Sequence, residues 1–113
     1  MQKKELEAFS HMPFVFVVKD SEGRYVWAND YFLEIAGASR LEEVLGKTDF
    51  DMVWKDDALS YASADRKVWE TGKPHKVRET VNRADGSCVT ANSCKFLDDL
   101  EGRQCLFVVG ISL

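Results

Sequence analysis

KDDALSYASADRKVWETGKPHKVRETVN, residues 55–82, is the stretch that decides the fold. Apolar residues recur at helical spacing through its first half, which predicts a long amphipathic helix. Asp56 or Asp57 can cap the start of this helix, because a carboxylate accepts the free backbone N–H groups of a first turn. Gly72 suits the left-handed position that ends a helix, and Pro74 prevents the helix from resuming. The alternating residues that follow predict a strand.

Two carboxylates in this stretch point at apolar surroundings. Asp65 falls inside the apolar face of the helix, between Tyr61 and Trp69. Glu79 falls on the valine side of the following strand. A buried charge needs a partner, which can be a backbone cap, a basic side chain or a bound ligand. The sequence leaves these three alternatives open.

The length of 113 residues and the ordinary apolar fraction describe one globular domain. The formal net charge of −4 argues against binding to nucleic acid, because nucleic-acid-binding proteins usually show a basic stripe. No apolar run approaches membrane-spanning length, and the first residues are too charged for a secretory signal. The three cysteines have no metal-binding spacing. Their odd number and the lack of a secretory signal predict reduced thiols and a cytoplasmic location without direct membrane contact.

Five runs of residues are typical of strands. Residues 14–18 are β-branched and aromatic without a break, which suits a central strand, and residues 24–28 form its hairpin partner. Residues 75–83, 87–97 and 104–111 follow as three antiparallel strands, and the last is as apolar as the first. Placing the two most apolar strands side by side predicts an α+β fold. Its five-stranded antiparallel sheet has the order 2-1-5-4-3, with helices packed on one face.

The hairpin, the long helix ending in Gly-x-Pro and the three further strands, in this order, resemble the PAS sensor domain. The resemblance covers nearly the whole chain, from Met12 to Leu113. It implies a hollow between the sheet and the long helix. It also implies a flanking N-terminal helix over residues 1–12 and a sensor domain over residues 13–113. The matching runs are VVKDSEGRYVWAND, GASRLEEVLGKT, DRKVWETGKPHKVRE, RADGS, KFLDDLEGR and VVGISL.

PAS domains are commonly found in histidine kinases, diguanylate cyclases, phosphodiesterases and some transcription regulators. The resemblance therefore implies a sensory input domain of a bacterial signalling protein, which binds a small ligand or dimerises to control an effector of the same chain. We expect the effector to be a histidine kinase or a diguanylate cyclase. The domain itself is expected to be non-catalytic, because it carries no catalytic motif. The chain ends where such proteins begin the motif that leads to a signalling helix, so we expect an excised domain.

A homodimer is expected through the N-terminal helix and the sheet. Leu6 and Phe9 are the apolar residues of that helix. The alternative to ligand sensing is a dimerisation module without a ligand, in which these two residues and the outward-facing strand residues make the contact.

Neither haem nor flavin is expected, and the cofactor is left open as a small organic ligand. Residues 92–97 (NSCKFL) look like the Asn-Cys-Arg-Phe-Leu run of flavin-binding LOV domains, but they fall in a predicted strand instead of the helical region. The long helix has no His to serve as a haem ligand, and His75 is expected at the rim. No metal site is predicted, because the acidic cluster lacks the Gly and terminal Glu of an EF-hand loop and helix capping explains it better. The acidic cluster consists of Asp49, Asp51, Asp56 and Asp57.

A small-molecule pocket between the long helix and the sheet is the site that the sequence predicts. Such pockets are mostly apolar with a few placed polar groups, and an acidic one would suit a cationic or amine-bearing ligand. In the alternative, the space is a filled core, where Asp65 accepts a hydrogen bond from a backbone N–H near Trp54 and Glu79 pairs with an Arg or Lys. The candidate lining is Trp54 as a lid, Tyr61, Asp65, Trp69, Glu79, Asn92 or Cys94, and Phe107.

Overall fold

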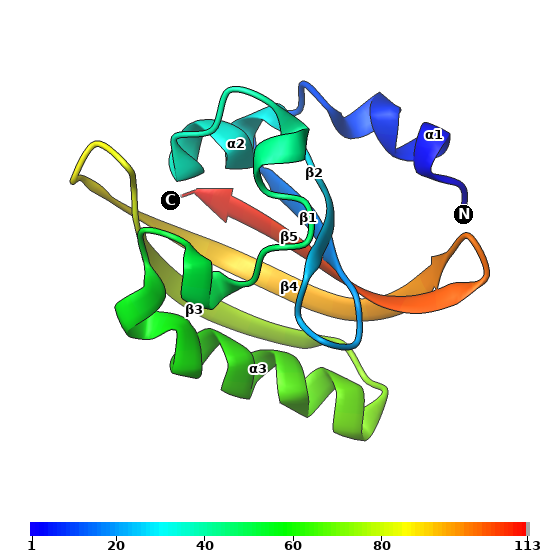
Figure 1. Ribbon diagram of the computed structural model, residues 1–113. Helices are drawn as coiled ribbons and strands as arrows, with labels where there is room; N and C mark the ends of the chain where they lie inside the picture. Colours follow the sequence, from blue (N-terminus) through cyan, green and yellow to red (C-terminus); the bar gives the residue numbers. More distant parts are fainter. Residues whose placement is uncertain (113) are drawn as a thin grey trace.

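Five antiparallel strands form one sheet of order β2-β1-β5-β4-β3 in the computed structural model, which describes residues 1–112 (Figure 1). The predicted α+β class and strand order are confirmed. The two most apolar strands, β1 and β5, pair at the centre as expected. The strands are β1 (Val15–Lys19), β2 (Tyr25–Ala28), β3 (His75–Asn82), β4 (Cys88–Leu100) and β5 (Arg103–Ser112).

Helices α2 (Asp30–Ala36) and α3 (Ala58–Thr71) pack on one face of the sheet. α3 stops at Gly72, whose φ of 69° is the left-handed conformation predicted there. The predicted aspartate cap at its start is wrong. The Asp57 side chain accepts no hydrogen bond from the first turn, and a 3₁₀ turn over Lys55–Asp57 leads into the helix instead. No helix within residues 1–112 is long and apolar enough to cross a membrane.

The N-terminal helix α1 (Lys3–Leu6) is the exception to the expected packing of helices on one face, because it covers the opposite face. Leu6 is fully buried there, and Phe9 stacks on Phe16 of β1 with ring centroids 4.9 Å apart. Leu6 and Phe9, expected at a dimer contact, therefore pack against their own sheet. Further 3₁₀ turns are Glu7–Phe9, Leu41–Glu43 and Asp49–Asp51.

The pairing of β4 with β5 decides which of their side chains face α2 and α3. Ser93 of β4 lies opposite Gly110 of β5, and both line the space beneath the two helices. Successive residues of a strand point to opposite faces. Asn92, Cys94 and Phe107 therefore point away from α2 and α3.

Candidate functional site

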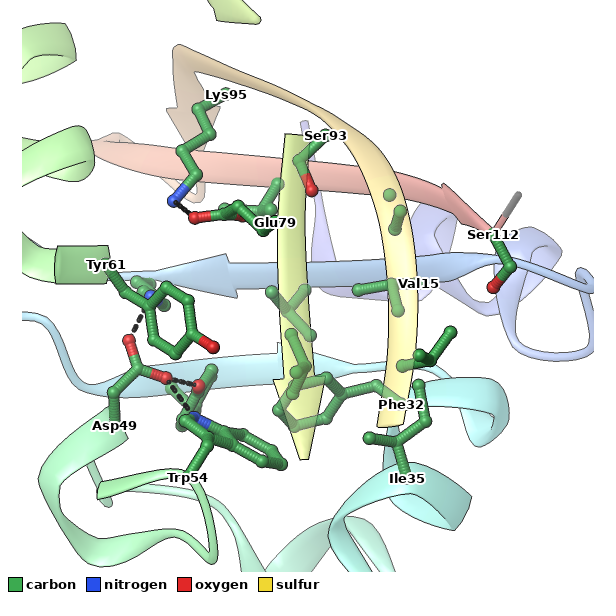
Figure 2. A pocket seen from close by; sticks show the side chains of 18 residues that line it. Val15, Phe32, Ile35, Asp49, Trp54, Tyr61, Glu79, Ser93, Lys95 and Ser112 are labelled. Atoms are coloured by element: carbon green, nitrogen blue, oxygen red, sulfur yellow. Dashed lines mark hydrogen bonds and ion pairs between the residues drawn. The ribbon is translucent and has the colours of Figure 1, made fainter. Parts of the chain in front are cut away.

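A cavity lies between the sheet and helices α2 and α3 (Figure 2). Its volume is about 70 Å³. One water needs roughly 10–15 Å³ of such space, so the cavity has room for several waters or a small organic group. The lining is mostly apolar, and its strand residues include Val15, Val17, Val81, Val89, Ala91 and Val108.

Five charged side chains form a continuous row of ion pairs at one wall of the cavity. The Lys19 ammonium donates to Asp49 at 2.7 Å and to Asp65 at 2.9 Å. The Lys95 ammonium donates to the other oxygen of Asp65 at 2.8 Å and to Glu79 at 3.0 Å. No side chain of the five is more than 12% exposed. In the order Asp49–Lys19–Asp65–Lys95–Glu79, these residues are named the ion-pair chain below.

The ion-pair chain joins five separate segments of the fold. Lys19 ends β1, Glu79 lies on β3 and Lys95 lies on β4. Asp49 comes from a 3₁₀ turn and Asp65 comes from α3. Lysines of the sheet are thus tied to both helical segments that cover them. Removing one member would leave a buried charge without its partner, which is strongly destabilising in proteins.

Asp49 accepts the most hydrogen bonds of the three carboxylates. The Tyr25 hydroxyl and the Trp54 indole N–H both donate to its Oδ1, the latter at 2.9 Å. Burial alone would raise the pKa of the Asp49 carboxyl, but the attraction of Lys19 and the accepted hydrogen bonds hold that pKa below its ordinary value. Burial alone would lower the pKa of Lys19, but the attraction of Asp49 and Asp65 raises it above its ordinary value. Asp49 and Lys19 therefore both stay charged at neutral pH.

The negative charge of these carboxylates contributes to raised pKa values of two tyrosines in the wall. Burial and the neighbouring charge of Asp49 raise the pKa of Tyr25 well above its ordinary value. Burial and nearby carboxylates raise the pKa of Tyr61 to about 12. The Tyr61 hydroxyl donates to the Thr80 carbonyl at 2.7 Å, which ties α3 to β3. Both phenols therefore act as neutral donors at physiological pH.

Three of the predicted side chains come together at the cavity: Trp54, Tyr61 and Glu79. Trp54 is a buried wall, in edge contact with Phe32 at 5.5 Å between ring centroids, and not a lid. Asp65 lies behind the lining and pairs with two lysines, so the predicted hydrogen bond from a backbone N–H near Trp54 is wrong. The predicted pairing of Glu79 with a basic residue is confirmed.

Four other predicted residues do not face the cavity. The predicted strand register is off by one residue, and such a shift moves every side chain of a strand to the other face of the sheet. The face opposite the cavity therefore carries Asn92, Cys94 and Phe107. Phe107 stacks instead on Phe96 with ring centroids 5.5 Å apart. Trp69 is half-buried against the core without reaching the cavity.

Sequence reasoning does not assign six polar residues to the cavity lining: Lys19, Tyr25, Asp49, Ser93, Lys95 and Ser112. Lysine is rarely buried unless it is paired, so a lysine beside apolar strand residues is usually taken as exposed. One signal was present, since alternation places Lys19 on the inward face with Val15 and Val17. The two carboxylates in apolar surroundings also required basic partners.

Two residues of the acidic cluster make contacts within the part of the chain that the structure describes. Asp49 belongs to the ion-pair chain, and Asp51 accepts the backbone N–H of Thr48 at 2.9 Å. Within residues 1–112, no three potential metal ligands come together. The capping predicted for the cluster is thus made by Asp51.

The family described as "PAS fold" matches residues 9–113. The comparison with curated proteins finds no matching sequence.

Three solved structures are similar over nearly the whole chain. One described as VqmA bound to DPO has a TM-score of 0.85 and 27% identity, over 98% of this chain and 57% of that chain. The Vibrio cholerae VqmA dimer in the absence of target DNA, described in connection with LuxR-type receptors, has a TM-score of 0.85 and 26% identity, over 100% of this chain and 52% of that chain. The PAS domain of an HTR-like protein from Haloarcula marismortui has a TM-score of 0.72 and 22% identity, over 98% and 91%. This chain spans about half the length of the VqmA chains that it matches.

Proposed function

The chain belongs to the PAS family, and from that premise we propose that it senses a small ligand, bound in the cavity beneath α2 and α3, and controls an effector. Its five-stranded sheet and helices are the fold of a PAS sensory domain. The observation that carries the proposal is the cavity itself. It is mostly apolar, it carries a few polar groups on one wall, and it lies between a sheet and helices.

Two further observations favour a ligand over a filled core. Gly110 supplies no side chain to the floor of the cavity, although its backbone does not adopt the left-handed conformation that would require glycine. VqmA, which is similar to this chain at 27% identity, is described as bound to DPO. A relative that shares the fold over 98% of this chain therefore takes a ligand.

The effector is proposed to belong to the same chain as the sensor. VqmA is described with target DNA and with LuxR-type receptors, so a DNA-binding effector is favoured over the histidine kinase or diguanylate cyclase expected from the resemblance alone. The sensor itself, with a formal net charge of −4, is not proposed to contact DNA. The proposal keeps a flanking segment over residues 1–12, a sensor over residues 13–113, and a bacterial cytoplasmic setting.

The mechanism follows from differential affinity. A ligand shifts an equilibrium between two arrangements only if it binds one of them better. The ion-pair chain fixes α3 and the 3₁₀ turn at Asp49 to the sheet, so a ligand that contacts Glu79 or Tyr61 would bias how these segments sit on the strands. The shifted position of these segments on the sheet would then alter the contacts with a dimer partner or an effector, and this alteration would be the signal.

A native mass spectrum of the purified chain tests the proposal. We expect an extra bound mass on the unchanged chain and on Asn92→Leu, whose side chain faces away from the cavity. Ala91→Leu, which extends a lining residue into the cavity, should lose that mass. A bare polypeptide mass, together with no rise in melting temperature on adding a small-molecule extract of the host cells, would contradict ligand sensing. The dimer fraction in the same spectrum would then support the ligand-free dimerisation module.

A further inference from the structure

One wall of the cavity carries hydrogen-bonding capacity that the protein does not use. The ion-pair chain holds three carboxylates against two ammonium groups, which is a formal net charge of −1. Both oxygens of Asp49 and both oxygens of Asp65 accept hydrogen bonds. Glu79 accepts at Oε2 alone, so its Oε1 has no partner within residues 1–112. Glu79 lines the cavity, so the spare acceptor and the net negative charge of the row lie on the same wall.

Ser93 is a second unused group on the same wall. Its residue is only 7% exposed, it lines the cavity, and its hydroxyl has no hydrogen-bond partner in the described part of the chain (Figure 2). A Cβ on Gly110, the residue opposite, would lie 3.2 Å from the Ser93 Oγ. Glycine at position 110 therefore leaves room in front of the hydroxyl. The hydroxyl is open to the cavity, so it is free to donate to or accept from a ligand atom.

The two strands place these groups within reach of one ligand. Glu79 of β3 pairs with Ala91, and Ser93 is two residues further along β4 on the same face. Diagonal neighbours of this kind lie roughly 7–8 Å apart at their Cα atoms, and their side chains can converge on one atom.

The charges around the cavity favour a cation over an anion. Lys19 and Lys95 are the only basic side chains of the lining among residues 1–112, and each already donates to two carboxylates. An ammonium has three N–H groups, so an anionic ligand would have one N–H per lysine to bind and three carboxylates to repel it. Burial is the largest cause of the raised pKa values of Tyr25 and Tyr61, and the neighbouring carboxylates, which act in the same direction, add a negative potential at this wall.

We propose that the cavity selects a small apolar ligand with one cationic nitrogen, which donates to the free oxygen of Glu79 and to the hydroxyl of Ser93. This inference rests on the proposed ligand-sensing function and adds the chemical class of the ligand. The volume of about 70 Å³ is roughly half of the 150 Å³ that holds benzene, so the apolar part is no larger than one small ring. The nitrogen would neutralise the net charge of the ion-pair chain.

The test uses the full 113-residue chain and three probes that share a ring and differ in charge. The probes are cyclopropylammonium, cyclopropanol and cyclopropanecarboxylate, titrated at pH 7 while NMR follows the amides of Glu79, Ser93 and Gly110. The ammonium should bind at least about tenfold more tightly than the alcohol, the ratio that one hydrogen bond to a charged group supplies. The carboxylate should bind more weakly than both.

Two substitutions in the cavity and one control substitution outside it locate the selectivity. Glu79→Gln keeps the size of the side chain and removes its charge, so it should abolish the preference for the ammonium. Glu70→Gln makes the same chemical change on the exposed side of α3 and should keep the preference. Ser93→Ala should weaken the ammonium by about fivefold, the loss of one neutral hydrogen bond. The ranking on the unchanged chain tests the proposal even if a variant does not fold.

The possible results separate the inference from the function on which it rests. If the alcohol or the carboxylate binds as tightly as the ammonium, or if Glu79→Gln keeps the preference, the cation assignment is overturned while ligand sensing stands. If no probe shifts the amides of the cavity at millimolar concentration, ligand binding in this cavity is overturned together with the inference.

Discussion

Lys95→Met should destabilise the domain more than any exposed lysine substitution, because Lys95 is the partner of two buried carboxylates. Its side chain is 2% exposed and donates to Asp65 at 2.8 Å and to Glu79 at 3.0 Å. A hydrogen bond to a charged group contributes about 1.5–3 kcal/mol, so the loss of two amounts to ~3–6 kcal/mol. Breaking a buried ion pair costs ~3–5 kcal/mol, a range that overlaps the first. We therefore expect the free energy of unfolding to fall by about 4 kcal/mol.

Urea unfolding followed by tryptophan fluorescence at pH 7 measures this change. With a urea dependence of about 2 kcal/mol/M, the midpoint should fall by about 2 M. Lys76→Met is the matched control, because it makes the same change on the exposed face of β3 and should stay within about 0.5 kcal/mol. Glu79→Gln added to Lys95→Met should recover part of the loss, since it removes one of the unpaired charges. A midpoint for Lys95→Met equal to that of Lys76→Met would refute the reasoning.

Two further predictions concern pH and backbone conformation. The lowered pKa of Asp49 adds stability that is complete above the pKa of an unfolded Asp, about 3.9, and is lost as the pH falls through the folded pKa. When the pH is lowered past about 4, the urea concentration at the unfolding midpoint should therefore decrease. This decrease should be less steep in Asp49→Asn. Gly37→Ala should cost more than Gly46→Ala by thermal unfolding. Both glycines have the left-handed backbone conformation, which costs an alanine roughly 1–2 kcal/mol. A Cβ on Gly37 would in addition lie 2.6 Å from the Cβ of Ala84, whereas a Cβ on Gly46 would meet no atom within 4 Å. Equal losses in the two variants would contradict the close contact between α2 and the β3–β4 hairpin.

The fold could be predicted from the sequence because its signals are local. The alternation of residues 75–83, the Asp-Gly turn at residues 85 and 86, and the Gly72 stop each act within a few residues and fix element type and length. The strand order also followed from a simple rule, since β1 and β5 are the two most apolar runs and pair at the centre. None of these signals depends on knowing which side chains meet across the core.

The lining of the cavity could be predicted only in part, because it depends on strand register. Glu79 was placed correctly, since the valines on either side of it mark the inward face of β3. β4 has no such marker near residue 92, where polar and small residues occupy both faces, so Asn92 and Cys94 were assigned to the wrong side. Phe107 was misplaced for another reason. β5 is buried on both faces, so the bulk of an aromatic residue does not reveal which face it occupies.

The charged wall shows why the partners of a buried charge are harder to predict than the buried charge itself. Asp65 and Glu79 could be identified locally, because each interrupts an apolar pattern. Their partners come from strands 46 and 16 residues away in sequence, and a spacing of that size carries no periodic signal. Retaining five such groups is costly, since a buried ion pair is often no more stabilising than apolar residues of the same size. Within residues 1–112, Oε1 of Glu79 is the one carboxylate oxygen of the ion-pair chain without a partner, so the cation proposed above would complete the row at this atom.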